Sequence, residues 1–239
     1  MSGHSKWATT KRAKGLVDAK RGAIFTKIGR LINIAARDKG GDPETNFSLR
    51  VAIDKAKSVN MPKENIERAI KKGTGEIEGG TIEELTYEGI GPANSQFILK
   101  CITDSKNRSA AEIRHLFAKH GGAFSAVMWN FEQKGVIRIL TENIKGKEMD
   151  EFELELIDAG ADDILKEEEG ITIYTAPVAL QNVKVFLEKK QIPMESVEIE
   201  YVAKDELDIS EDDKVKIEKL IDAIEDNEDI SDYYTNVNI

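Results

Sequence analysis

The sequence predicts a multidomain α+β protein, with an N-terminal three-helix domain and two α+β domains, one ferredoxin-like and inserted in the other. Three observations support this class. Apolar residues recur at helical spacing from 22 to 72, strands and helices are mixed from 82 onward, and 135–203 follow the order β-α-β-β-α-β. The expected domains are 1–78, then 82–132 together with 207–239, and 133–206.

Residues 22–72 predict three helices that each bury one face. The first begins at Gly22 and is stopped by the GGDP at 40–43, the second covers about 45–58, and the third starts near Pro62 and ends at Gly73. Three such helices are expected to pack as a small bundle. The side chains expected to face inward are Ile24, Ile28, Leu31, Ile32 and Ala35, then Phe47, Val51 and Ala56, and then Ile66, Ala69 and Ile70.

The GTGEIEGG segment at 73–80 interrupts the helical pattern. It resembles a phosphate-binding loop but follows a helix and not a strand, so we interpret it as a linker. The expected middle domain then has strands at 83–89 and 95–103, a helix over 108–122 and a strand at 126–132. The helix is expected to start with a capping box from Ser109 to Glu112, and Trp129 is expected within the last strand.

The expected inserted domain consists of two crossover units that give a four-stranded antiparallel sheet with both helices on one face. Its last strand, 196–203, alternates Val197, Ile199 and Tyr201 with Glu198 and Glu200, which predicts a covered apolar face and one solvated sheet face. A capped acidic helix begins near Ser210 and is followed by a tail. Because a lone amphipathic helix must bury its stripe, we expect this helix to return to the middle domain.

The charge is divided unevenly along the chain. Residues 1–72 contain 17 Lys and Arg against 7 Asp and Glu, a net charge of +10, while residues 73–239 contain 17 basic and 37 acidic side chains, a net charge of −20. Such a separation favours a surface for a polyanion confined to the N-terminal part.

Several function classes lack support in the sequence. The chain has one cysteine, Cys101, which is expected as a buried inert thiol and is typical of a reducing compartment. No signal peptide and no apolar run of membrane-spanning length are present, so a cytoplasmic location is expected. The three histidines are scattered and form neither a metal-binding pattern nor a catalytic motif. We therefore expect no catalytic residues, no metal site and no cofactor.

The first 21 residues form a basic arm with a single acidic residue, Asp18. Such a segment buries too little surface to order by itself but can order on phosphates. Trp7 either stacks on a base or packs on the helical bundle. The alternatives for the arm are an acidic protein partner or a membrane surface, and the membrane is disfavoured because no large apolar residues alternate with the charges.

Six segments resemble the YebC/PmpR family, which includes the mitochondrial translational activator of cytochrome c oxidase. They are GHSKWATTKRAK, GAIFTKIGRLINIAAR, MPKENIERAIKKG, YEGIGPAN, IRHLFAKHGG and WNFEQKG. The similarity extends over essentially the whole chain and implies a helical N-terminal domain and two α+β domains, one inserted in the other. It also implies either a DNA-binding transcriptional regulator or a ribosome-associated translation factor.

Together these observations predict a non-enzymatic nucleic-acid-binding regulator of gene expression that binds DNA. The alternative is a translation factor that binds ribosomal RNA and the ribosome, and the rival class is an enzyme with an unrecognised site between domains. No recognition helix of the helix-turn-helix type is apparent, so base specificity is expected to be weak. The expected contact residues are Lys6, Trp7, Lys11, Arg12, Lys14, Lys20, Arg21, Lys27, Arg30 and Arg37.

Overall fold

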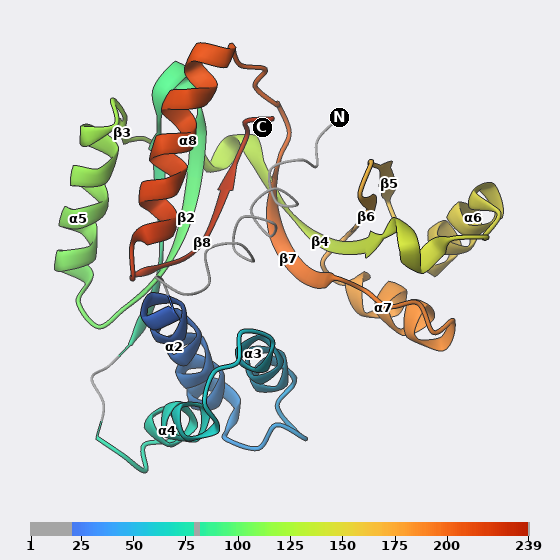
Figure 1. Cartoon of the computed structure of the whole chain (residues 1–239), viewed down its shortest axis with the longest axis horizontal. Coiled ribbons are helices and arrows are strands. Elements are labelled where there is room, and N and C mark those ends of the chain that lie inside the picture. The colour runs from blue at the N-terminus through green and yellow to red at the C-terminus, as the bar shows by residue number, and fades with distance from the viewer. Residues whose placement is uncertain (1–20, 79–81, 239) are drawn as a thin grey trace. The chain divides into compact units, whose positions relative to one another are not determined.

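The computed structural model describes residues 21–78 and 82–238 (Figure 1). These residues form α-helices and two four-stranded sheets, so the predicted α+β class is confirmed. They divide into two compact units. The first comprises 21–125 with Glu211–Tyr233, and the second comprises Ala126–Ser210 with 234–238.

The first unit begins with helices α2 (Arg21–Lys39), α3 (Phe47–Ser58) and α4 (Lys63–Gly73). They pack around one apolar cluster that includes Ile32 of α2, Leu49 of α3 and Ile66 of α4. The end of α4 approaches α2 very closely, because a Cβ at Gly73 would lie 2.4 Å from the carbonyl oxygen of Asn33. Glycine is therefore required where the third helix ends.

Asn46 fixes the start of α3 against the end of α2. Its side chain accepts a hydrogen bond of 3.0 Å from the backbone N–H of Leu49, as an N-cap residue does. The amide nitrogen donates to the carbonyl oxygens of Ala35 and Gly40, both at 2.7 Å. This capping sets the helix register, and the buried stripe of α3 becomes Leu49, Ala52 and Ala56. The prediction that Phe47 and Val51 face inward was wrong, because both side chains are exposed in that register.

The sheet associated with the first unit has the order β3-β1-β2-β8. Strands β1 (Glu83–Ile90) and β2 (Gln96–Thr103) pair antiparallel and are joined through the short 3₁₀ helix η1 (Pro92–Asn94). Strand β3 (Ala123–Phe124) pairs with the end of β1, and β8 (Ile230–Thr235) lies beside β2. Residues 230–235 were expected in a tail, and that prediction was wrong: their Ile230 and Tyr234 are buried.

Helices α5 (Lys106–Lys119) and α8 (Glu211–Asp226) pack on each other and on one face of this sheet (Figure 1). The ring of Phe117 in α5 lies 6.2 Å from that of Phe97 in β2. Leu220 of α8 lies against the turn at Gly91. A Cβ atom at position 91 would lie only 2.6 Å from the Leu220 side chain. The expected capping box was wrong, because α5 starts after Ser105 and Ser109 is buried within it, where it binds another partner.

The second unit contains a sheet of order β5-β6-β4-β7 with antiparallel pairing throughout. Its elements are β4 (Phe131–Leu140), η3 (Thr141–Ile144), α6 (Met149–Ala159), β5 (Asp163–Lys166), β6 (Gly170–Thr175), α7 (Leu180–Lys189) and β7 (Ser196–Ala203). Residues 128–130 form the 3₁₀ helix η2 (Met128–Asn130), so the strand expected through Trp129 was wrong. The Trp129 side chain is exposed, and its indole nitrogen donates to the carbonyl of Ala126.

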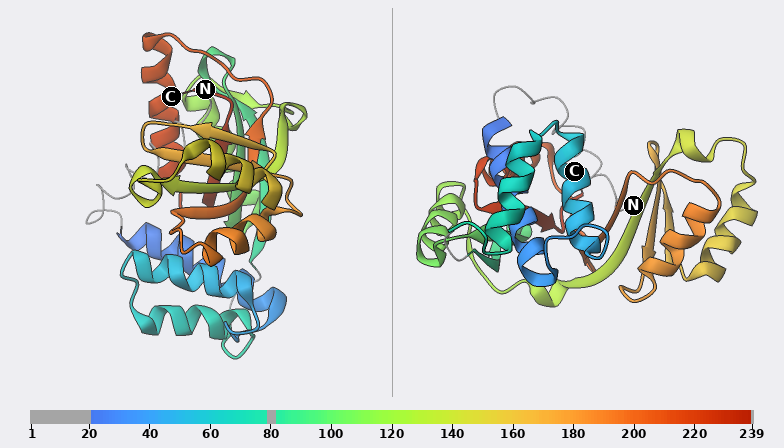
Figure 2. Two further views of the ribbon diagram at one scale, coloured as in Figure 1. Left: turned by 90° about the vertical axis from the view of Figure 1, so that its right-hand side faces the viewer. Right: turned by 90° about the horizontal axis from the view of Figure 1, so that it is seen from below.

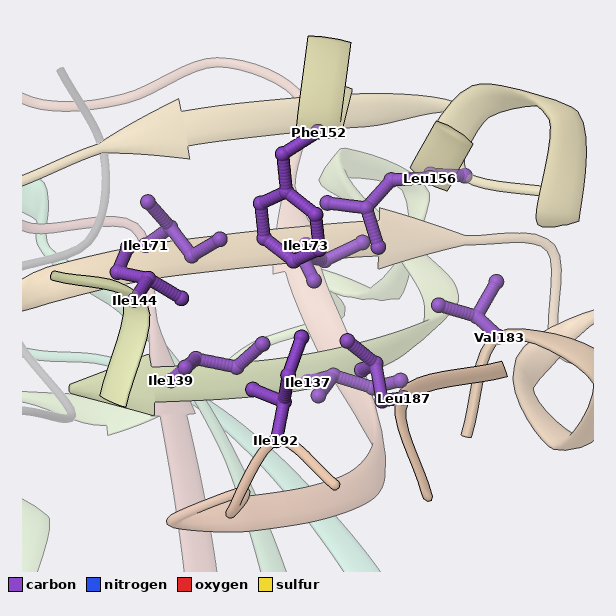
Figure 3. Close-up of a cluster of buried hydrophobic side chains, with 11 residues drawn as sticks. Ile137, Ile139, Ile144, Phe152, Leu156, Ile171, Ile173, Val183, Leu187 and Ile192 are labelled. Atoms are coloured by element: carbon purple, nitrogen blue, oxygen red, sulfur yellow. The ribbon is translucent and has the colours of Figure 1, made fainter. Parts of the chain in front are cut away.

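Helices α6 and α7 lie on the same side of this sheet (Figure 2). Figure 3 shows the core that they enclose: Ile137 and Ile173 of the strands meet Phe152 and Leu156 of α6 and Leu187 of α7. This apolar cluster accounts for the covered face, because alternate residues of each strand point to it.

The opposite face of the same sheet is not solvated as predicted. Glu200 is buried and accepts two hydrogen bonds from the Arg138 guanidinium, at 2.6 and 3.0 Å. Ile199, which was expected to be covered, is 45% exposed. Arg138 and Glu200 are thus buried together as a bidentate ion pair. The alternation of residues in one strand does not predict this pair, because the two residues lie on different strands.

Candidate nucleic-acid interface

The ten predicted contact residues fall into two groups. Six of them, Lys6, Trp7, Lys11, Arg12, Lys14 and Lys20, lie outside the described residues. Arg21 is the first residue of α2, and its side chain is likewise outside the description. The other three, Lys27, Arg30 and Arg37, are placed along α2.

Lys27 and Arg30 use their donors within the first unit. The Lys27 ammonium donates to the carbonyl oxygen of Glu225 at 2.6 Å, and burial lowers the pKa of this lysine although nearby carboxylates oppose the shift. Arg30 donates to the carboxylate of Asp229 at 2.7 Å and to the carbonyl oxygens of Glu228 and Ile102 at 2.8 and 3.1 Å. Both side chains therefore connect α2 to the sheet and to α8.

Asp229 is the centre of this connection. Its carboxylate is 4% exposed and accepts hydrogen bonds from Ser109, Thr103 and Arg108 as well as from Arg30. Burial by itself raises the pKa of Asp229, but the four donors outweigh that effect and the pKa lies below its ordinary value. The partner of Ser109 is thus a carboxylate 120 residues away in sequence, which a local capping pattern cannot indicate.

Arg37 remains more accessible than the other two. Its side chain is 43% exposed, and its Nε donates to Asp38 at 3.2 Å. One terminal nitrogen donates to the carbonyl oxygen of Ile82. Arg37 therefore lies at the surface near the start of β1, with part of its guanidinium engaged by the chain itself.

A pocket of about 450 Å³ lies between α2 and α4, beside the start of β1 and the end of β2. Successive turns of both helices line it, with Asn65, Arg68 and Lys72 contributed by α4 at spacings of three and four residues. Asn33 and Phe25 line it from α2. The prediction of this helix rested on its apolar stripe alone and did not include the polar face, although polar residues recur there at the same helical spacing.

The charges at the pocket are unbalanced. Arg30 is neutralised by Asp229, and Asp104 is paired with Arg108 at 2.8 Å. Arg68 and Lys72 are exposed and have no acidic group within ion-pair distance in the described part of the chain, and Arg68 donates to the Asn65 side chain at 3.1 Å. Two cations are therefore available to an anion at the rim.

Cys101 is buried in β2, as predicted, and burial raises the pKa of its thiol to about 12, with the nearby Asp229 charge adding to the shift. A thiol with that pKa remains protonated at neutral pH and is a poor nucleophile. Within 21–78 and 82–238, no three His, Cys, Asp or Glu side chains are grouped so as to hold a metal ion. None of the helices described there combines the length and apolarity needed to cross a membrane.

Comparison with known proteins gives matches over nearly the whole chain. A family model described as the TACO1/YebC protein N-terminal domain matches residues 5–76, and one described as the TACO1/YebC second and third domain matches residues 82–237. A relative from Thermoanaerobacter pseudethanolicus, named a probable transcriptional regulatory protein, is 47% identical over 100% of this chain and 98% of its own. A relative of the same name from Persephonella marina is 48% identical over 99% and 95%.

One solved structure is also similar. The crystal structure of a conserved hypothetical protein from Aquifex aeolicus superposes with a TM-score of 0.80 at 41% identity, and covers 93% of this chain and 92% of that one.

Proposed function

The chain belongs to the TACO1/YebC family, and from this premise we propose that it is a non-enzymatic, nucleic-acid-binding regulator of gene expression whose N-terminal part binds DNA. The names of its relatives support a regulatory role. We further propose the three-domain division 1–78, 82–132 with 207–239, and 133–206. The strand order β5-β6-β4-β7 supports a ferredoxin-like inserted domain.

The observation that carries this proposal is the division of charge. A net charge of +10 is confined to residues 1–72 of a chain whose remainder has −20. Phosphates attract the first part and repel the second, so a polyanion is bound in one orientation. The phosphate contacts that we propose are the arm cations Lys6, Lys11, Arg12, Lys14 and Lys20 together with Arg21 and Arg37, with Trp7 stacking on a base.

Lys27 and Arg30 have a different place in the proposal. Their donors already bind carbonyl oxygens and Asp229, so we assign them the role of holding α2 in place. The phosphates are then bound by cations that remain exposed. The exposed basic side chains of the three helices, in addition to Arg37, are Lys39, Arg50, Lys55, Lys57, Lys63, Arg68, Lys71 and Lys72. The contact surface thus extends beyond the arm.

The proposal is tested by the salt dependence of binding. A labelled duplex DNA is titrated with the full chain by fluorescence anisotropy at several salt concentrations. The slope of log K against log salt is expected to be about −0.9 for each phosphate contact. Replacing Lys11, Arg12 and Lys14 with Gln should make the slope shallower by about 2.7 if all three bind phosphates.

The matched control replaces Lys119, Lys145 and Lys189, which are exposed and lie outside residues 1–72, with Gln. This control should leave the slope unchanged. An equal change in both triple variants overturns the arm as the contact segment. Binding that depends sharply on DNA sequence contradicts the expected weak base specificity.

The alternative is a translation factor that binds ribosomal RNA, and the charge division favours it equally because both targets are polyanions. Sedimentation of a cell lysate at low salt separates the two. Co-migration of the protein with ribosomal particles, lost in the Lys11, Arg12 and Lys14 variant, supports the ribosome. Migration away from them supports DNA.

A further inference from the structure

The pocket between α2 and α4 is lined by an amide side chain, Asn33, for which the described residues provide no hydrogen-bond partner. Asn33 is 8% exposed and lines the pocket, and among the described residues no group forms a hydrogen bond with its side chain. Because Asn33 lines the pocket, its amide can donate to and accept from a group that enters there. Asn46, by contrast, makes three side-chain hydrogen bonds, which join the end of α2 to the start of α3. A ligand in the pocket is therefore able to form hydrogen bonds with Asn33.

The walls of the pocket define the chemistry of that ligand. Phe25, Met61 and Ile82 provide apolar surface, and Asn33 and Asn65 provide amides that both donate and accept. Arg68 and Lys72 add two positive charges at the rim that no carboxylate neutralises in the described residues. A ligand that fits these apolar, amide and cationic side chains has a flat apolar ring, a hydrogen-bonding edge on that ring and an attached anion. This is the chemistry of a nucleotide.

We propose that this pocket binds one unpaired nucleotide of a single-stranded nucleic acid, with its base at Asn33 and its phosphate on Arg68 and Lys72. This inference rests on the proposed nucleic-acid binding, and it specifies a single strand as the form that the pocket recognises. The volume of about 450 Å³ falls within the range of roughly 300–1,000 Å³ typical of small-molecule sites. A base inside a duplex is stacked and paired, so it cannot enter the pocket without being extruded.

The experiment compares a labelled 12-nucleotide oligothymidylate, a 12-nucleotide oligouridylate and a 12-base-pair duplex as probes of the full chain. Arg68→Gln with Lys72→Gln should weaken binding of both single strands by tenfold or more and make the salt slope shallower by about 1.4, at about 0.7 per phosphate contact. The matched control changes Lys39 and Lys55, two exposed cations that do not line the pocket, to Gln. This control should weaken single-stranded and duplex binding equally.

Asn33→Leu tests the base contact separately from charge. It removes the amide at similar size, and we expect single-stranded binding to weaken about fivefold with an unchanged salt slope and unchanged duplex binding. Circular dichroism melting of each variant verifies that the fold is retained. If Asn33→Leu unfolds the chain, Asn65→Ala at the pocket rim replaces it.

Each outcome separates the pocket from the wider function. If the wild type binds nucleic acid but the pocket and control variants lose single-stranded affinity equally, the pocket proposal is wrong and the proposed function stands. If the wild type binds no nucleic acid, the proposed function fails. In that case the full chain is titrated with thymidine and uridine monophosphates. Saturable binding that is lost in Asn33→Leu supports the pocket as a site for a free nucleotide, and the absence of binding overturns the pocket proposal.

Discussion

A single buried carboxylate connects the helices at the start of the chain to the sheet that follows them. Asp229 accepts hydrogen bonds from side chains of α2, β2 and α5, although these partners are 120 to 199 residues away in sequence. Four donors around one carboxylate offset the cost of burying its charge. The residue is therefore a structural centre, and removing its charge leaves Arg30 without its counter-ion.

Replacing Asp229 with Asn should destabilise the protein by about 3 kcal/mol, because a buried carboxylate with four donors is lost and the partly buried Arg30 is left without its counter-ion. Urea unfolding at neutral pH, followed by circular dichroism, measures the loss. Asp222→Asn on the exposed side of α8 is the matched control and should change stability by less than about 0.5 kcal/mol. Equal losses in the two variants contradict the central role of Asp229.

The stabilisation from Asp229 should also depend on pH in a defined direction. Its folded-state pKa lies below the ordinary value of a carboxyl, so the stabilisation is complete above about pH 4, the unfolded pKa, and is lost as pH falls through the folded pKa. The difference in unfolding free energy between wild type and Asp229→Asn should stay constant from pH 7 to about 5 and shrink below about pH 4. A difference that grows on acidification contradicts the assigned pKa direction.

At the scale of elements, the cap of α3 shows how one side chain sets a whole helix. Asn46 is fully buried. Its side chain accepts a hydrogen bond from the backbone N–H of Leu49 in the first turn of α3 and donates one to the carbonyl oxygen of Ala35 near the end of α2. Asn46→Ala should cost about 2 kcal/mol, since it removes the cap and leaves the Ala35 carbonyl without a donor. Thermal unfolding of this variant is compared with Ser48→Ala, an exposed neighbour in the same helix. Identical melting temperatures contradict the capping role.

The buried pair between β4 and β7 gives a second prediction at this scale. Glu200→Gln should destabilise the protein by about 3 kcal/mol, because the Arg138 charge stays buried without an anion. The double variant Arg138→Met with Glu200→Leu should recover most of the loss, since two apolar side chains need no charge compensation. Chemical unfolding of both variants tests this, and a double variant less stable than Glu200→Gln would falsify the explanation.

The same elements show what the sequence can and cannot predict. Helices α2 and α4 and strands β1, β2 and β6 follow from local periodicity and stop signals, because their burial patterns are set by one neighbouring layer. The inward residues of α3, the role of Ser109 and the burial of Glu200 depend on partners that are distant in sequence. The polar face of α4 follows from its helical spacing, but the pocket also needs residues of α2, and the packing of the two helices is visible only in three dimensions.

At the scale of the whole molecule, the opposed charges of the N-terminal part and the remainder should govern how fast and how tightly a polyanion binds. The net charge of −10 repels DNA at distances beyond contact, while the +10 of residues 1–72 attracts it once it is close. The screening length is about 30 Å at 0.01 M salt and about 3 Å at 1 M. Repulsion from the acidic remainder therefore acts only at low ionic strength.

This balance predicts that removing acidic charge outside the contact surface strengthens binding. The variant Glu83→Gln, Glu84→Gln and Asp222→Asn neutralises three exposed carboxylates in the first unit. Its affinity for a labelled duplex should rise about threefold near 0.02 M salt and equal that of the wild type near 0.5 M, because salt then screens the repulsion. Stopped-flow association rates should rise in parallel at low salt while dissociation rates stay constant. A gain that persists at 0.5 M salt indicates a direct contact of these side chains with DNA and contradicts a purely long-range effect.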